Sequence, residues 1–301
     1  MLILLNRSFP RHRAQATFTV VASVVLLLTL SGCFQKPSPL TSDTHCDPAA
    51  LVVTQAKPNS TAATAKERLP SNHLTLFIWN SFKGKTDGWL TDLSVLSQNH
   101  ELLLLQEAYL QDDLLAFLDD SKWNWSMATT FRYKAIPTGV LTGSKVAADL
   151  HCQMTAMEPW IRLPKGILVS RYPLADTNEK LVVANVHLIN FTINTKAYQD
   201  QLTKLKSILE QHIGPLIVAG DFNTWNNART QLVEKFMTDL QLRPVEFSNS
   251  LRSEIFGRKV DHVYFRDMAV TSARGIDVVT SDHNPMAVTF SIPRSGKQPE
   301  T

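Results

Sequence analysis

Short apolar runs alternate with amphipathic stretches from Leu74 to the C-terminal region. Six apolar runs are bounded by turn residues and are typical of buried strands. They cover residues 74–79, 102–105, 166–170, 181–188, 216–220 and 286–290. Residues 196–213 instead repeat apolar positions at helical spacing, which predicts an amphipathic helix with one buried face. His212 falls late in this predicted helix, where a cation suits the helix dipole.

Strands interleaved with helices predict a layered α/β architecture. The stretch from residue 73 to residue 294 has the usual size of one large α/β domain, so it can bury a sizeable core. We therefore expect a single globular domain over 73–294, followed by a disordered tail over 295–301.

Polar side chains that can bind metals or carry protons recur at the ends of these strands. They are Asn80, Gln106, Glu107, His187, Asn190, Asp221, Asn223, Asp261, Asp282 and His283. Solvated turns would use Gly, Pro and Ser just as often, so the recurrence favours one shared polar pocket. A simple turn at "SDHN" (281–284) is the alternative if Glu107 and Asp221 lie far from it.

The residue types in this predicted pocket indicate its chemistry. Glu107 offers only oxygen ligands, and neither a second nearby His nor a Cys cluster accompanies it, which favours Mg²⁺ over Zn²⁺, with Mn²⁺ as an alternative. A hard cation beside imidazole and amide groups suits the hydrolysis of a phosphate ester. That reaction needs a Lewis acid, an oriented water and donors for the developing charge.

Seven segments occur in a familiar order: "IWNSFKG", "LLLLQEAY", "TGVLTGS", "NVHLINF", "VAGDFNTW", "KVDHVYF" and "TSDHNPMAV". Together they resemble the motifs of the endonuclease/exonuclease/phosphatase superfamily, which includes pancreatic-type deoxyribonucleases, exonuclease III-like repair enzymes, bacterial sphingomyelinases and inositol-polyphosphate phosphatases. The resemblance covers nearly the whole globular region. It implies a four-layer α/β sandwich, in which two packed mixed β-sheets are flanked by helices.

The resemblance also implies a role for each matching residue. Glu107 would be the principal Mg²⁺ ligand, with Asn80 beside it and Asp282 near or in the metal shell. His187 and Asn190 match the mid-chain motif whose side chains touch phosphate in relatives.

Four further residues would act on the phosphate and the attacking water. His283 would contact the scissile phosphate, and Asp261 would fix its tautomer through a hydrogen bond. Asp221 would orient or deprotonate the water, and Asn223 would donate to the transition-state oxygen.

One departure from the family pattern follows the first strand. Some nucleases of the superfamily carry an acidic residue two places after the strand-end Asn, where this chain has Phe82 followed by Lys83 and Gly84. A second carboxylate at the cation is therefore not expected, which favours catalysis with one metal ion.

The N-terminal region predicts export. Three Arg precede an uncharged run over residues 14–35 with a dense apolar centre, which is typical of a secretory signal, here residues 1–32. The run ends in "LSGC", which resembles the lipobox of bacterial lipoproteins and implies a lipidated Cys33. Because residue 34 is Phe and not Asp, we expect attachment to the outer membrane, on its periplasmic side or at the cell surface. A plain membrane-spanning helix is the alternative.

Residues 33–72 are rich in Pro, Ser, Thr and Ala, which predicts a flexible tether. Three of the 30 basic residues lie in the predicted leader, so the mature chain has 27 basic and 27 acidic residues. This neutral balance is not typical of a protein that coats nucleic acid. Cys46 and Cys152 would face an oxidising compartment, but their sequence separation leaves their pairing open.

These features favour an exported Mg²⁺-dependent phosphodiesterase that uses direct water attack, with a nuclease as one form of it. A phospholipase C or sphingomyelinase-like enzyme and a phosphatase of small phosphorylated metabolites are the alternatives within hydrolysis. The alternative outside catalysis is a silent binding lipoprotein. The expected partners are accordingly a nucleic acid, a phospholipid or a phosphorylated metabolite, together with a membrane reached through the lipid anchor. A monomer is expected.

Overall fold

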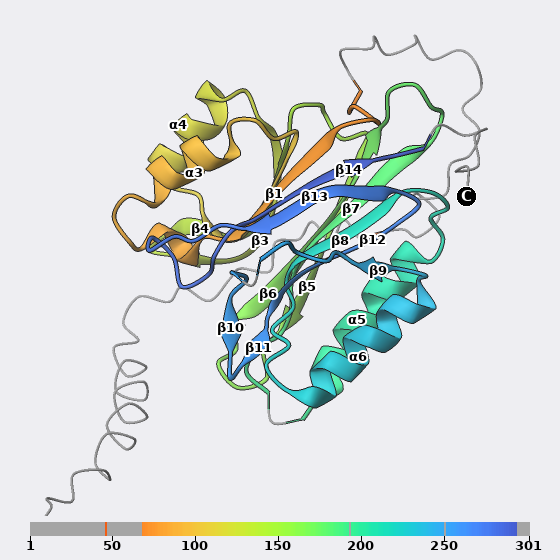
Figure 1. Cartoon of the computed structure of the whole chain (residues 1–301). Coiled ribbons are helices and arrows are strands. Elements are labelled where there is room, and N and C mark those ends of the chain that lie inside the picture. Colours follow the sequence, from red (N-terminus) through yellow and green to blue (C-terminus); the bar gives the residue numbers. More distant parts are fainter. Residues whose placement is uncertain (1–45, 47–67, 193, 250, 294–301) are drawn as a thin grey trace, which may run out of the picture.

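The computed structural model describes residues 46, 68–192, 194–249 and 251–293 (Figure 1). The predicted signal peptide, Cys33, the predicted C-terminal tail and most of the predicted tether lie outside these residues. Within the described part of the chain, no helix has both the length and the apolar character needed to span a membrane.

The first sheet has six strands in the order β13-β14-β1-β2-β4-β3. Its strands are β1 (Leu74–Asn80), β2 (Leu102–Tyr109), β3 (Asn124–Tyr133), β4 (Ile136–Ser144), β13 (Ala269–Gly275) and β14 (Met286–Ser291). β1 and β2 run parallel, whereas the other neighbours are antiparallel, so the sheet is mixed.

The second sheet also has six strands, in the order β5-β6-β7-β8-β12-β9. Its strands are β5 (Leu150–Met157), β6 (Pro164–Pro173), β7 (Lys180–His187), β8 (Leu216–Asp221), β9 (Arg243–Pro244) and β12 (Asp261–Arg266). Only β7 and β8 pair in parallel. A small separate hairpin consists of β10 (Glu254–Ile255) and β11 (Arg258–Lys259).

Helices cover the outer faces of the two sheets (Figure 1). α3 (Trp89–Ser97) and α4 (Asp112–Asp120) pack on the first sheet, and α5 (Lys196–Leu209) and α6 (Asn227–Asp239) pack on the second. A short 3-10 turn, η2 (Phe82–Gly84), follows β1. The predicted four-layer α/β sandwich with two packed mixed sheets is therefore confirmed.

Strand alternation assigns the side chains of each strand to two different layers. In β1, Leu76 and Ile78 enter the core between the sheets, whereas Phe77 and Trp79 pack with α3 and α4. In β8, Ile217 and Ala219 fill the same inter-sheet core, and Leu216 and Val218 pack with α5 and α6. Positions two residues beyond the last inner apolar residue therefore continue the inner face.

The helix predicted for 196–213 is shorter in the structure, and the role suggested for His212 is wrong. α5 ends at Leu209, and the His212 ring lies beyond it, almost fully buried, with Nε2 donating to the Pro215 carbonyl at 3.0 Å. Burial lowers the pKa of His212 to about 4. The ring is therefore neutral at pH 7 and supplies no charge to the helix dipole.

Two points of the predicted tether are attached to the domain. Cys46 forms a disulfide with Cys152 in β5, which answers the pairing question that the sequence left open. Leu69 is fully buried and forms an isolated bridge with Leu174.

We predict that replacing Cys46 or Cys152 with Ser lowers the free energy of unfolding by about 2–5 kcal/mol. The bond joins residues separated by 106 positions, so its removal frees a long loop in the unfolded chain. Urea unfolding followed by tryptophan fluorescence measures this difference. A reductant should cause the same loss in the native sequence and none in either variant, and equal stability of all three proteins would contradict the prediction.

Candidate active site

Three buried polar side chains stand side by side where β7, β8 and β12 leave the inter-sheet core. The register pairs His187 with Asp221 and Asp221 with Asp261. Asp221 follows the inner apolar residues Ile217 and Ala219 by strand alternation, and Asp261 precedes the inner residue Val263 in the same way. The alternation that builds the core therefore also aims these side chains into the space between the sheets.

The first sheet supplies residues to the same place. The Asn80 side chain at the end of β1 donates from Nδ2 to Asp221 Oδ2 at 3.2 Å, which joins the two sheets. The loop before β14 is held against β1, because Trp79 Nε1 donates to the His283 carbonyl at 2.7 Å and Ser281 Oγ donates to the Asn80 carbonyl at 2.7 Å. β1 and β14 are antiparallel neighbours, which brings the end of one to the start of the other.

His283 is paired with Asp261, with 2.7 Å between Nδ1 and Oδ2. Burial alone would lower the pKa of His283. The carboxylates of Asp261, Asp221 and Asp282 together outweigh burial and raise the pKa to about 10. The imidazole is therefore protonated at neutral pH and carries a hydrogen-bond donor on each ring nitrogen.

Asp221 accepts the Asn223 backbone N–H at 2.9 Å as well as the Asn80 amide. Burial, with a contribution from the nearby charge of Asp261, raises the pKa of the Asp221 carboxyl to about 6. Oxygen and nitrogen atoms of Asp221, Asp261 and His283 lie within 4.8 Å of one another. These atoms are close enough to hold a metal ion, and with a protonated His283 ring the trio also suits proton handling.

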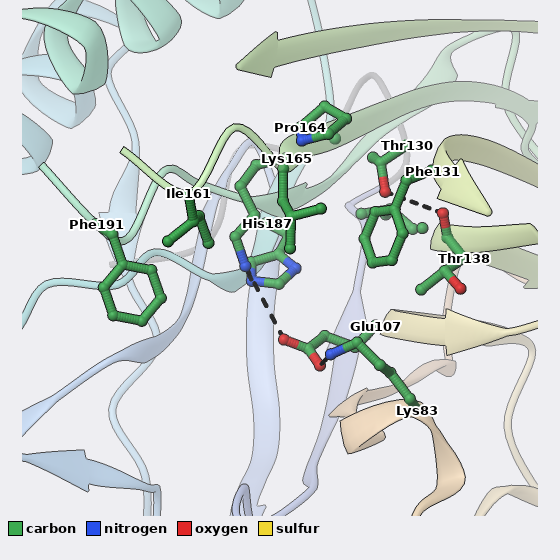
Figure 2. A pocket seen from close by; sticks show the side chains of 14 residues that line it. Lys83, Glu107, Thr130, Phe131, Thr138, Ile161, Pro164, Lys165, His187 and Phe191 are labelled. Carbon is green, nitrogen blue, oxygen red and sulfur yellow. Dashed lines mark hydrogen bonds and ion pairs between the residues drawn. The ribbon is translucent and has the colours of Figure 1, made fainter. Parts of the chain in front are cut away.

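Glu107 lies at an irregularity in β2. The β2–β4 register shifts between Leu105 and Ala108, and Glu107 takes a positive φ of 51°. Lys83 Nζ donates to Glu107 Oε2, and Lys165 Nζ lies 3.9 Å from Oε1 (Figure 2). Burial would raise the pKa of this carboxyl, but the two ammonium groups hold it well below its usual value. Glu107 is therefore ionised at neutral pH.

His187 is neutral although it lies 3.3 Å from Asp221 Oδ2. Burial and the Lys165 ammonium lower its pKa well below the usual value. Lys165 Nζ donates to His187 Nε2 at 2.6 Å, which places the ring proton on Nδ1. The contact between His187 and Asp221 is therefore not an ion pair.

Asn190 and Asn223 lie on loops next to the cluster and hold those loops in place. Asn190 Oδ1 accepts Trp225 Nε1 at 2.8 Å, and Asn223 Nδ2 donates to the Leu188 carbonyl at 3.0 Å. The guanidinium of the almost fully buried Arg229 donates to the backbone carbonyls of both asparagines. These bonds fix the loops that follow β7 and β8.

Asp282 lies exposed at the mouth of the site. The pKa of its carboxyl is raised because part of the carboxyl is covered by protein and because the Glu107 charge lies nearby. The side chains of Glu107, Asn80 and Asp282 offer oxygen donors, and oxygen donors suit a hard divalent cation such as Mg²⁺. The ionised state of Glu107 adds to that fit.

The structure gathers seven of the predicted side chains into one cluster and places the two asparagines beside it. The seven are Asn80, Glu107, His187, Asp221, Asp261, Asp282 and His283. Lys165 and Arg229 also belong to this region, but their sequence positions look like those of ordinary surface charges. Lys83 is visible in the sequence only as the residue after Phe82, where the chain departs from the family pattern.

Comparisons with known proteins show what this chain is similar to. A family model described as Endonuclease/Exonuclease/phosphatase family matches residues 78–283. The chain is similar to a UPF0294 protein of Vibrio parahaemolyticus, with 37% identity over 229 residues, 76% of this chain and 81% of the relative. A UPF0294 protein of Yersinia pestis is 36% identical over 225 residues, 74% of this chain and 86% of the relative.

Solved structures show the same fold. An endonuclease/exonuclease/phosphatase family protein from Leptotrichia buccalis has a TM-score of 0.57 at 13% identity, covering 73% of this chain and 100% of that one. The human Nocturnin catalytic domain with bound sulfate anion has a TM-score of 0.58 at 15% identity, covering 73% and 95%.

We predict that His283 of the metal-free protein stays protonated through neutral pH, and that Asp261→Asn lowers its pKa toward the usual value. Asp261 is the nearest negative charge, so its loss leaves burial less opposed. The folded-state pKa lies above the ordinary 6.5. The interaction of protonated His283 with Asp261 therefore contributes its full free energy to folding below pH 6.5. This contribution is lost as the pH rises through about 10. Nitrogen-15 correlation spectra of the histidine rings report the titration. An unchanged pKa in Asp261→Asn would contradict the assignment.

Proposed function

The chain belongs to the endonuclease/exonuclease/phosphatase family, and on this premise we propose that it is a metal-dependent phosphodiesterase that hydrolyses a phosphate ester by direct attack of water. The observation that carries the proposal is the meeting of the His283–Asp261 pair, Asp221 and Glu107 in one cluster, in which the pKa values of His283 and Asp221 are raised and that of Glu107 is lowered.

The metal part of the proposal assigns Glu107, Asn80 and Asp282 to Mg²⁺, with Mn²⁺ as a substitute. When bound, the ion supplies positive charge to a phosphoryl oxygen. These three residues provide oxygen donors from β1, β2 and the loop before β14, so a bound ion would link segments from the beginning and the end of the domain.

The protein's own groups handle the protons. His283, held by Asp261 at 2.7 Å, donates to an oxygen of the phosphate. Asp221, whose pKa of about 6 is raised mainly by burial, accepts a proton from the attacking water. Lys165 adds a positive charge for the phosphate, and its Nζ is bonded to His187. His187 and Asn190 would contact the phosphate as well. Asn223 fixes the position of Asp221 through its backbone N–H.

We also propose that the protein is exported and anchored through a lipid on Cys33, on the outer membrane. The disulfide between Cys46 and Cys152 supports this location, because such bonds persist in oxidising compartments. We expect Cys33→Ala to shift the protein from the membrane fraction to the soluble fraction of the cell envelope. Equal membrane association of Cys33→Ala and the native chain would contradict lipidation.

Hydrolysis of bis-(p-nitrophenyl) phosphate tests the activity. We expect turnover with Mg²⁺ and none with EDTA, a loss of most activity in Glu107→Gln, and a loss of roughly 10²-fold or more in His283→Ala. Glu210→Gln and His151→Ala alter exposed residues outside the site and are the matched controls. A loss below tenfold in His283→Ala would remove His283 from the reaction. No turnover on any phosphodiester would favour the silent binding lipoprotein.

A substrate panel then separates the activities within the family. Plasmid DNA, RNA, sphingomyelin and inositol phosphates are incubated with the native protein and with His283→Ala, so that contaminating hydrolases are recognised. The substrate whose hydrolysis depends on His283 identifies the class.

Lys83 offers a test of the metal site that does not depend on turnover. Lys83 is bonded to Glu107 and therefore competes with a cation for that carboxylate. We expect Lys83→Met to bind Mn²⁺ more tightly than the native protein in isothermal titration calorimetry. Lys85→Met, which removes an exposed lysine two residues away, should leave the affinity unchanged. Weaker binding by Lys83→Met would show that Glu107 does not hold the ion.

A further inference from the structure

An apolar pocket opens directly beside Glu107. Its cavity is about 200 Å³. Its charged end is lined by Lys83, Glu107 and Lys165, with the neutral His187 beside them (Figure 2). Apolar side chains line most of the remainder. They are Phe131, Val140, Ile161, Leu163, Pro164 and Phe191.

The pocket has two walls from different parts of the fold. Phe131 and Val140 come from β3 and β4 of the first sheet. Ile161 and Leu163 come from the connection between β5 and β6, and Phe191 follows β7. Figure 2 shows Phe191 and Ile161 on one side of Lys165 and His187, and Phe131 on the other. A ligand group in this space would therefore contact both sheets.

A buried carboxylate braces the wall that comes from the second sheet. Glu158 is fully buried, and its side chain accepts the backbone N–H groups of Asn190 at 2.8 Å and Phe191 at 3.1 Å. Glu158 Oε1 also lies 3.9 Å from Lys165 Nζ. These contacts tie the β5–β6 connection to the segment after β7, so the wall is preformed and aligned with the charged end.

Exposed apolar side chains continue from the pocket to the surface. Phe191, which lines the pocket, is 51% exposed. Met157 at the end of β5 is 52% exposed, and Trp160, on the connection that carries Ile161, is 61% exposed. Large apolar side chains with this much exposure are typical of binding surfaces when they adjoin a pocket. The apolar lining therefore has an open entrance.

We propose that this pocket takes an aliphatic chain of an amphiphilic phosphate ester, with the phosphate at the end lined by Lys165 and His187. The proposal rests on the proposed phosphodiesterase function and names the substrate class for the same site. Aliphatic carbon gains free energy on contact with Ile161, Leu163 and Val140. A nucleobase edge or a sugar hydroxyl beside Ile161, Leu163 and Val140 would lose its hydrogen bonds with water and find no polar partner on those side chains. The lining also has two hydroxyls, those of Thr130, which donates to the Thr138 carbonyl, and of Thr138, so one polar group could be accommodated at that point.

Equilibrium binding of n-alkylphosphonates, which are not hydrolysed as esters, tests the proposal. Methyl-, butyl- and hexylphosphonate are titrated into the native protein with Mg²⁺ by calorimetry, below the concentrations at which they aggregate. We expect the Kd to fall by roughly threefold for each methylene that enters the cavity. The same Kd for methyl- and hexylphosphonate would overturn the proposal, as would tighter binding of a nucleoside monophosphate than of hexylphosphonate.

Variants locate the effect in the pocket. Ile161→Ser and Phe191→Ser should reduce the gain from methyl- to hexylphosphonate and leave methylphosphonate binding unchanged. Ile213→Ser, which alters a side chain that is 91% exposed and does not line the pocket, is the matched control. An equal chain-length gain in Ile161→Ser, Phe191→Ser and Ile213→Ser would overturn the assignment.

The two proposals fail separately in these assays. A protein that hydrolyses bis-(p-nitrophenyl) phosphate with Mg²⁺ but binds all phosphonates equally keeps the phosphodiesterase function and loses the aliphatic pocket. A protein that shows the chain-length gain without hydrolysis of any phosphodiester keeps the pocket and loses the enzyme.

Discussion

The face-to-face packing of the two mixed sheets is the constraint on which the site depends. Each strand at the interface points every second side chain into it. The same alternation continues at the strand end, where the inward side chains are polar. Asn80 on β1 and Asp221 on β8 occupy the next inward positions, and their side chains are 3.2 Å apart. A fold that packs these sheets must therefore bring distant polar residues together, because the same register sets the core and the site.

The pairing of charges then determines the protonation state of each of these polar residues. Isolated carboxylates in this interior would be costly, so each one is paired with a cation or a strong donor. Glu107 is paired with Lys83 and stays ionised, and Asp261 is paired with His283 and keeps that ring protonated. Asp221, with less compensation, is left with a raised pKa. One buried cluster therefore contains both a proton donor and a proton acceptor, which is the arrangement that acid–base chemistry on a phosphate requires.

The sequence predicts the part of this arrangement that strand alternation dictates. Asp221 and Asp261 stand next to apolar runs, so their convergence can be inferred from the pattern and the family motifs. Lys83, Lys165 and Arg229 could not be found in that way, because single basic residues look like solvated charges until the fold places them against buried groups. The pairing of Cys46 with Cys152 could not be predicted from the sequence either, since only the folded path of the chain brings these two distant cysteines together. The sequence pattern did not predict the end of α5, because apolar residues continue at helical spacing past Leu209 although the helical conformation of the backbone ends there.

The central claim is that residues from both sheets surround one divalent ion and one phosphate. Anomalous scattering from crystals soaked with Mn²⁺ and inorganic phosphate tests it most directly. The account predicts a manganese peak in contact with the Glu107 carboxylate, and phosphate density between that peak and the His283 imidazole. A manganese peak that avoids Glu107, or phosphate bound away from His283, would contradict it.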